Sequence, residues 1–559
     1  MRTLPDILRM HLQERPDFPV LRFLSKEECD TVTYEGLLAG SAAYAIALKE
    51  AGIRPGEPVV IILKHGQQLV YAFFGAMLNG SIPSIMPYLT EKLSPERYRE
   101  SLRSLISITE PAAMITYPDF SNEVSAATDD RDSVRAVLLS SEVEIGDGFA
   151  GLTLKDFNAR PEDIVLLQHS SGTTGLQKGV ALSHHAVLNQ INAYAQAMQL
   201  TAEDVVVSWL PLYHDMGLIA GFLLPILAGN ELVLMSPFEW VRAPFRLMQA
   251  VSTYKGTLSW LPNFAYNFCA KKIRDRHLEG VDLSTWRAIS NCSEPMRWES
   301  HQVFFERFKS YGLRYEALAT CYAMAENVFA VTQGGIESGV TVDIVDRRKL
   351  QEERLAKPTE AGDHALKMLS AGKPIPGTEV RILDADRQAL PERHLGEIAL
   401  RSDCMLTGYY HRDDLTQQAF HEGWYLTGDL GYIADGELYV TGRQKELIIV
   451  GGKNIYPQDL EELAREVPGV HPGRVVAFGV FNESIGTEEV AIVAETDEPD
   501  EAERRNIRAA IREKVNTGSD VILRYVEVVD RQWLIKTSSG KISRKANREK
   551  YLQTYHSSS

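Results

Sequence analysis

The sequence predicts an α/β protein of several domains, and three observations support this prediction. The chain has 559 residues, which is too long for one hydrophobic core, so we expect about two to four domains. Hydrophobic residues make up 44% of the chain and charged residues 24%, as in ordinary soluble globular proteins. Strand-like and helix-like segments alternate through the first half, which is typical of helices layered on largely parallel sheets.

The first half supplies the elements of these layers in order. Residues 58–63 ("PVVIIL") are predicted to form a strand, and residues 66–80 a helix with apolar residues at helical spacing. A second helix is expected to begin after Ser183, which suits the N-cap position. Buried strands are predicted at 163–168, 204–210, 231–235 and 256–261.

The second half has a different character and predicts two smaller units. Short strands and turns from about residue 375 indicate a small antiparallel or barrel-like β subdomain over 371–443. Residues 444–559 then mix strands and helices, which indicates a separate α+β domain that we expect to act as a mobile lid. The N-terminal domain is therefore predicted to span 1–443, with its α/β subdomains in 1–370.

Charge and hydropathy argue against two kinds of partner. The net charge of −16 argues against nucleic acid, because binding to a phosphate backbone needs clustered Lys and Arg. The longest apolar run, 217–229, is shorter than the roughly 20 residues of a membrane helix and contains Pro225. It is predicted to be a buried helix or helix–strand segment, with no membrane span.

The cysteines and the N-terminus favour a cytoplasmic protein. The first residues carry scattered charges without an apolar core, so we expect no targeting segment. Five cysteines lack metal-binding spacing, and reduced thiols are the best interpretation. They are Cys29, Cys269, Cys292, Cys321 and Cys404.

A glycine-rich stretch, 170–178 ("SSGTTGLQK"), is the strongest candidate for a binding site. Gly172 and Gly175 are three residues apart and Lys178 follows three later, so the spacing is not that of a Walker loop. Hydroxyls and exposed N–H groups in such a turn can nevertheless surround phosphate oxygens. A flexible surface loop is the alternative, but the position after a buried strand favours phosphate binding.

Five further side chains suit nucleotide chemistry, although each also has an ordinary structural interpretation. His214, at a strand end, could orient a substrate carboxylate or be a structural histidine. Glu326 lies among small and apolar residues, where a carboxylate is costly unless it is paired or binds a metal. Tyr322 could stack on a purine or pack in the core. Asp429 is expected in a tight turn where it could accept ribose hydroxyls, with Arg443 close by.

Lys541 lies in a loop of small residues within "KTSSGK", near the C-terminus. Taken alone, this stretch could be a frayed basic tail.

In this order and at these separations, the motifs resemble the adenylate-forming superfamily of acyl-CoA synthetases, luciferases and peptide-synthetase adenylation domains. The resemblance covers nearly the whole chain. Residues 208–225, 291–296 and 451–461, together with the pair Ala325–Glu326, resemble the fatty acyl-AMP ligases within it. The charged segment 334–377 lies where that family carries an insertion, although it could also be an exposed excursion without a role.

The resemblance implies a ligase that uses ATP and Mg²⁺. A fatty acid would be converted to acyl-AMP and then transferred to the phosphopantetheine thiol of an acyl carrier protein. The insertion is expected to hinder transfer to coenzyme A. An acyl-CoA ligase of the same fold is the alternative, and an adenylate-binding protein without activity is a third hypothesis.

The resemblance also implies a role for each matching residue. Lys541 would bridge the carboxylate and the α-phosphate, and the lid would turn about Lys445. Glu326 would bind Mg²⁺, while Asp429 and Arg443 would hold the ribose. The β- and γ-phosphates would be held by Ser170, Ser171, Gly172, Thr173, Thr174, Gly175 and Lys178. Adenine would lie between the segment Tyr322, Ala323, Met324, Ala325 and the segment Ser293, Glu294, Pro295. The acyl carboxylate and chain would meet Trp209, His214, Asp215, Met216 and Gly217.

Three residues depart from the family pattern, and the acid is poorly specified. Gln177 and Ile535 replace prolines, and Ala323 replaces a glycine, so alanine is strained there if the position needs a positive φ. A medium-chain or modified acid is expected if Trp209, Trp260, Asn263 and Asn267 narrow or polarise the pocket. Basic residues near the C-terminus are expected to dock the acidic carrier protein, namely Arg544, Lys545 and Arg548.

Overall fold

The computed structural model describes most of the chain. The described residues are 2–25, 29–88, 95–128, 133–146, 159–170, 178–360, 362, 364–450, 453–482, 487–519, 521–537 and 540–556.

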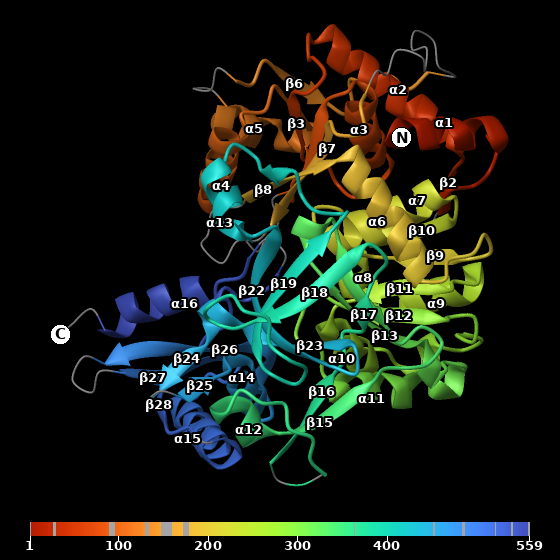
Figure 1. Ribbon diagram of the computed structural model, residues 1–559. Coiled ribbons are helices and arrows are strands. Elements are labelled where there is room, and N and C mark those ends of the chain that lie inside the picture. The colour runs from red at the N-terminus through yellow and green to blue at the C-terminus, as the bar shows by residue number, and fades with distance from the viewer. Residues whose placement is uncertain are drawn as a thin grey trace.

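A nine-stranded mixed sheet forms the centre of the molecule, with the strand order β17-β14-β13-β12-β11-β9-β10-β1-β2 (Figure 1). The strands from β1 to β13 along this order pair in parallel, whereas β2, β14 and β17 pair antiparallel at the edges. The predicted α/β class is therefore confirmed. The strands are β1 Leu21–Leu24, β2 Cys29–Val32, β9 Val205–Ser208, β10 Glu231–Met235, β11 Leu258–Leu261, β12 Ala288–Asn291, β13 Leu318–Ala323, β14 Ala330–Gly334 and β17 Lys373–Pro374.

A second sheet, of order β4-β3-β5-β6, is parallel throughout. The predicted strand at 58–63 is β3, and the predicted helix at 66–80 is α3. The strands are β3 Pro58–Ile61, β4 Ile82–Ile85, β5 Ala113–Thr116 and β6 Ala136–Leu139. The helices of this part are α1 Leu4–Glu14, α2 Tyr34–Glu50, α3 Gln67–Leu78, α4 Pro95–Thr109 and α5 Ser121–Thr128.

The strand predicted at 163–168 does not join a parallel sheet. It is β7 (Ile164–Ser170), which pairs antiparallel with β8 (Lys178–Ser183), and β8 pairs with β20 (Gly408–Tyr409). The reason is the short connection between β7 and β8, because a parallel pair needs a crossover of a dozen or more residues.

The apolar run after β9 forms a helix of an unexpected type. Residues Met216–Leu223 form a π-helix, η2, which continues into α7 (Leu224–Ala228). A single turn of π-helix is the common form, so eight residues in this conformation at a strand end indicate a specialised segment. The other helices on the central sheet are α6 His184–Ala197, α8 Pro237–Arg242, α9 Phe245–Tyr254, α10 Asn263–Lys272 and α11 Trp298–Phe308. The predicted N-cap is confirmed, because the Ser183 hydroxyl accepts the Ala186 N–H at 3.1 Å.

An antiparallel β sheet follows, as expected for the small β subdomain. It consists of β18 Thr378–Leu383, β19 Gly396–Ser402, β21 Phe420–His421, β22 Trp424–Ala434 and β23 Glu437–Arg443, with α13 at Asp413–Ala419. Most buried residues beyond β23 form two hydrophobic clusters of C-terminal side chains, whereas Tyr456 packs in a cluster shared with the β subdomain. Their elements are β24 Ile448–Val450, β25 Lys453–Ile455, α14 Pro457–Arg465, β26 Val470–Asn482, β27 Thr487–Thr496, α15 Glu501–Gly518, β28 Leu523–Val529 and α16 Arg544–Tyr551.

The segment 334–377 is folded and contacts both parts of the molecule. It contains β15 (Val342–Asp346), α12 (Arg347–Glu352) and β16 (Ala365–Leu369), and Figure 1 shows it beside the C-terminal unit. Arg347 Nη1 donates to the Gly518 carbonyl at 3.2 Å, and Asp343 accepts the Tyr432 hydroxyl at 3.0 Å. The segment therefore links the β subdomain to the C-terminal unit. None of the helices in the described ranges combines the length and apolar character that a bilayer-spanning helix requires.

Candidate active site

The candidate residues collect where the strands of the central sheet end. The carboxyl ends of parallel strands share one edge, and this edge is where α/β folds bind ligands. His214 follows β9, Ser293 follows β12, and Tyr322 lies near the end of β13. The topology thus brings together three motifs that lie far apart in the sequence.

His214 and Asp215 form a polar pair in front of η2. The Asp215 carboxylate lies 2.6 Å from His214 Nδ1 and accepts the Met216 N–H at 2.8 Å, which caps the helix. Burial raises the pKa of Asp215, but the charges of His214 and Lys541 outweigh burial and hold it below its usual range. The Lys541 ammonium, from the far end of the chain, is therefore close to this pair.

Lys541 is held on a tight loop that Asn547 fastens. The Thr537 N–H donates to the Lys541 carbonyl at 2.7 Å, and the Ile535 N–H donates to Asn547 Oδ1 at 2.8 Å. The amide Nδ2 of Asn547 returns a bond to the Ile535 carbonyl at 2.8 Å, and Asn547 is fully buried. The departure at Ile535 now has a reason, because proline has no N–H to donate.

The two ends of the predicted phosphate loop are held side by side, while residues 171–177 lie outside the described residues. Ser170 and Lys178 are cross-strand partners in the β7–β8 pair. Lys178 Nζ lies 4.5 Å from the centre of the Tyr409 ring. Burial lowers the pKa of Lys178, the charge of Glu326 opposes this effect, and Lys445 adds to it. Lys178, Glu326 and Lys445 therefore converge at the end of this hairpin.

Glu326 lies in a short 3₁₀ turn, η6 (Ala325–Asn327), and accepts the Tyr409 hydroxyl at 2.8 Å. Val328 follows with φ +62° although it is β-branched and buried, so the backbone here is strained. Such strain collects at functional sites. No group of three or more potential metal ligands is found within the described part of the chain. Glu326 is thus a single carboxylate, which suits an ion that takes its other ligands from phosphates and water.

Asp429 lies in strand β22 and not in the tight turn that was expected. It pairs with Arg443 across the β22–β23 ladder, and Arg443 Nε donates to Asp429 Oδ1 at 3.0 Å. The Tyr322 hydroxyl donates to Asp429 Oδ2 at 2.7 Å. Burial, with the Asp429 charge next, raises the pKa of Tyr322 well above its usual range, so the phenol remains a donor. A long β22–β23 hairpin presents Asp429 because Gly428 adopts a positive φ of +71° beside it.

The remaining adenine candidates have varied surroundings. Ser293 has φ +69°, and its hydroxyl lies 3.8 Å from Met216 Sδ. Glu294 accepts the Phe264 N–H at 3.0 Å, so its carboxylate caps the first turn of α10. Ala323 is not among the residues with positive φ, so alanine is not strained there. Met324 donates its N–H to the Phe329 carbonyl at 2.8 Å.

Trp209 and Gly217 frame η2 in different ways. Trp209 stacks on Trp240 with ring centres 3.6 Å apart and is almost fully buried. A Cβ on Gly217 would collide with the Pro211 carbonyl, so only glycine allows η2 to approach this loop. Asn263 and Asn267 both donate to the Ser300 hydroxyl, at 3.1 and 2.8 Å. These amides thus hold α10 against α11.

Among the three residues expected to dock the carrier protein, Arg544 is the least exposed. Arg544 is paired inside the C-terminal unit, where it donates to both Glu461 oxygens at 3.0 and 2.8 Å and also contacts Glu446. Its side chain is therefore mostly covered. Lys545 and Arg548 are more exposed, with Lys545 4.0 Å from Glu549.

Sequence reasoning missed two residues that shape the site. Tyr409 contacts both Lys178 and Glu326, and Asn547 holds the loop of Lys541. Neither stands in a recognisable motif. Asn547 gives no signal in the sequence, because it stands among the polar residues of α16.

Comparisons with known proteins agree with this geometry. The family model described as "AMP-binding enzyme" matches residues 8–410. The medium-chain-fatty-acid–[acyl-carrier-protein] ligase JamA of Moorena producens is 30% identical, with 99% of this chain and 95% of JamA covered. A Caulobacter vibrioides protein provisionally named acyl-CoA synthetase is also 30% identical, with 95% and 92% covered.

A solved structure from a study of fatty acyl-adenylate ligases of E. coli and L. pneumophila superimposes with a TM-score of 0.91. It is 28% identical and covers 100% of this chain and 99% of its own. The predicted resemblance to the adenylate-forming enzymes, and to the fatty acyl-AMP ligases among them, is confirmed. This chain belongs to the family of AMP-binding enzymes.

Proposed function

We propose that this protein activates a fatty acid with ATP and transfers the acyl group to the phosphopantetheine thiol of an acyl carrier protein. One observation carries the proposal: the charge of Lys541 acts on the Asp215 carboxylate, which is paired with His214, although about 330 residues separate Lys541 from Asp215 in the sequence. The ammonium of Lys541, beside the His214–Asp215 pair, could bind both the carboxylate of the acid and the α-phosphate of ATP.

In the first step, a carboxylate oxygen would attack the α-phosphorus of ATP. The new O–P bond forms as the bond to the β-phosphate oxygen breaks, which yields acyl-adenylate and pyrophosphate. Negative charge spreads over the phosphoryl oxygens in the transition state, so positioned cations supply most of the catalysis. Lys541 would stabilise the α-phosphate and carboxylate, and His214 would orient the acid.

The leaving pyrophosphate would lie at the β7–β8 hairpin. Lys178 would bind it together with the loop 170–175, whose role is proposed from the family resemblance. Glu326 would hold Mg²⁺, and the charge of that ion would neutralise part of the phosphate charge. Tyr409 would hold the Glu326 carboxylate in place, since its hydroxyl is 2.8 Å away.

The nucleoside would be held by the β subdomain and by two loops of the central sheet. Asp429 and Arg443 would bind the ribose, and Tyr322 would contribute one wall of the adenine site. Met324 and Ala325 would line the same wall, with Ser293 to Pro295 opposite. Lys445 would serve as the hinge of the lid.

In the second step, the thiol would lose its proton and attack the acyl carbonyl, and AMP would leave. A carrier protein is favoured as the source of the thiol because JamA, by its name, acylates a carrier protein. Coenzyme A is the second candidate acceptor, because the Caulobacter relative carries the name of an acyl-CoA synthetase. Five free cysteines support a cytoplasmic location.

The acceptor is tested by offering both thiols in parallel. Purified protein is incubated with ATP, Mg²⁺ and a fatty acid, and then with coenzyme A or with a phosphopantetheinylated carrier protein. Mass spectrometry follows AMP, acyl-adenylate and thioester. Thioester on the carrier alone supports the proposal, whereas efficient acyl-CoA formation would replace it with the acyl-CoA ligase function.

A further inference from the structure

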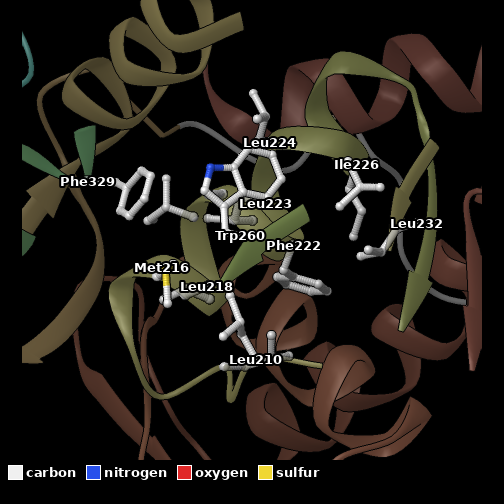
Figure 2. Packing of buried hydrophobic residues seen from close by; sticks show 14 of the residues in the cluster. Leu210, Met216, Leu218, Phe222, Leu223, Leu224, Ile226, Leu232, Trp260 and Phe329 are labelled. Carbon is white, nitrogen blue, oxygen red and sulfur yellow. The ribbon is translucent and has the colours of Figure 1, made fainter. Parts of the chain in front are cut away.

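The layer beneath the active-site edge of the central sheet contains a tryptophan fixed by hydrogen bonds. An acid whose carboxylate reaches His214 must send its hydrocarbon chain to solvent or into the apolar layer between η2 and the sheet. Figure 2 shows this layer, with Trp260 among Met216, Leu223 and Phe329. The side chains that fill this layer would therefore limit the length of the acyl chain that the protein accepts.

The strand register places Trp260 on the covered face. Leu258 of β11 pairs with Val206 of β9, and Trp260 pairs with Ser290 of β12. Because side chains alternate along a strand, Ser208, Trp260 and Ser290 point to the same face. The π-helix covers that face, since a Cβ on Gly221 would lie only 2.7 Å from Ser208 Oγ.

The indole cannot easily move aside, because a chain of hydrogen bonds holds it. Trp260 Nε1 donates to the Tyr194 hydroxyl at 2.7 Å, and that hydroxyl donates to Gln333 Oε1 at 2.8 Å. Gln333 Nε2 donates to the Gly334 carbonyl at 2.9 Å. Trp260 and Tyr194 are each 1% exposed. Breaking any of these bonds leaves a buried polar group without its partner, which fixes the ring in one orientation.

This network lies directly next to the active-site residues. The Ser293 hydroxyl lies 3.7 Å from Cys292 Sγ and 3.8 Å from Met216 Sδ. Cys321, which precedes Tyr322, is a neighbour of Tyr194, since burial and this thiol raise the pKa of the Tyr194 phenol. An acyl chain that passes Met216 would therefore meet the network next.

We propose that Trp260, held by Tyr194 and Gln333, forms the floor of the acyl pocket and restricts the protein to short and medium-chain acids. This inference rests on the proposed function, and it deepens it by naming the residue that sets chain length. With a rigid floor, each methylene beyond the limit lowers kcat/KM for the acid. One methylene in a hydrophobic pocket changes kcat/KM by about tenfold or more.

The test compares Trp260→Leu with the unchanged protein over straight-chain acids from butanoic to hexadecanoic. Acid-dependent ATP–pyrophosphate exchange gives kcat/KM for each acid. The unchanged protein should prefer the shorter acids. W260L should shift the optimum to longer acids, with a gain of about tenfold or more for those the unchanged protein rejects.

Trp286→Leu is the matched control. Trp286 is as deeply buried as Trp260 and lies near Phe304. It precedes the first residue of β12, however, whereas Trp260 lies near the carboxyl end of β11. W286L should leave the chain-length profile unchanged while lowering the melting temperature. If W260L does not fold, Tyr194→Phe replaces it, because it removes the hydroxyl without changing the volume; it should shift the profile the same way by about fivefold.

Two results would overturn the inference while the proposed function stands. One is a folded W260L protein, or a folded Y194F protein, with the chain-length profile of the unchanged protein. The other is a preference of the unchanged protein for hexadecanoic acid. Absence of exchange with every acid would instead refute the proposed function, and the inference with it.

Discussion

At the scale of single residues, the site is organised by hydrogen bonds between its own charged groups. Asp429 accepts from Tyr322 and Arg443, Glu326 accepts from Tyr409, and Asp215 is paired with His214. Each carboxylate is thereby oriented before any substrate arrives. Such fixed orientation is what electrostatic catalysis requires, because no reorganisation is then needed in the transition state.

Lys541→Ala should separate the two half-reactions. Removing the ammonium should slow acyl-adenylate formation by about a hundredfold or more, because the developing phosphoryl charge loses a positioned cation. Thioester formation from acyl-adenylate supplied ready-made should remain close to that of the unchanged protein. Single-turnover kinetics of each step measure this difference.

Lys514→Ala is the control for that substitution, since Lys514 is a partly exposed lysine on α15 of the same C-terminal unit. It should change neither half-reaction. An equal loss of both half-reactions in K541A would contradict a role confined to adenylation.

The residue scale was also the hardest to predict. The charged residues stand in sequence motifs, so Lys541, Asp429 and Glu326 could be identified from the sequence. Tyr409 and Asn547 could not, because their roles depend on contacts between segments distant along the chain. Glu294 has a contact that its motif does not reveal, because its carboxylate caps α10.

At the scale of elements, periodicity predicted buried strands well and their pairing less well. The strand expected at 231–235 is β10 with the same limits. The β7–β8 pair is antiparallel because its connection is short, which hydropathy does not reveal. The π-helix was also missed, since it depends on Gly217 and Gly221 fitting against Pro211 and Ser208.

The Lys541 loop is an element whose geometry depends on one buried amide. Asn547→Ala should leave the N–H and carbonyl of Ile535 without partners and lower the unfolding free energy by about 1–3 kcal/mol. The displaced loop should also slow adenylation more than thioester transfer. Urea unfolding and the two half-reaction assays check both effects.

Asn516→Ala is the matched control for the loop. Asn516 also accepts a backbone N–H in the C-terminal unit, that of Leu523 at 2.8 Å, but it lies on α15. N516A should not alter the ratio of the two half-reactions. If N547A lowers both half-reactions in proportion, Asn547 supports the fold alone and does not position Lys541.

At the scale of the whole molecule, the C-terminal unit is joined to the rest by polar contacts and by a small hydrophobic cluster in which Tyr456 packs with Leu430 and Tyr439. Arg297 Nη2 donates to the Gln458 carbonyl at 3.2 Å, and Gln458 Nε2 donates to the Thr441 carbonyl at 2.6 Å. Figure 1 shows the unit beside β22, β23 and α12. Interfaces of this kind allow domains to move, which suits a lid that must serve two steps.

Stability of the whole molecule should fall in mild acid because of buried histidines. Burial lowers the pKa of His184 to about 4, although the charges of Asp163 and Asp6 act to raise it. Its Nδ1 accepts the Leu4 N–H at 3.2 Å. The unfolded chain, where histidine titrates near 6.5, binds the proton first, so stability is full above about pH 6.5 and is lost as pH falls toward 4. The loss attributable to His184 is about 3 kcal/mol.

His184→Gln tests this expectation. Urea unfolding from neutral pH down to about pH 4 should show a shallower decline of the unfolding free energy than in the unchanged protein. An identical decline in both proteins would show that His184 does not carry this part of the acid sensitivity.

The central claim, that the molecule joins a fatty acid to AMP, is tested most directly by ATP–pyrophosphate exchange. Labelled pyrophosphate should enter ATP only when a fatty acid and Mg²⁺ are present, and without any thiol acceptor, because the first step alone is reversible. Exchange in the presence of octanoic acid that disappears without the acid would bear out the claim. No exchange with any acid, from a folded protein, would contradict it.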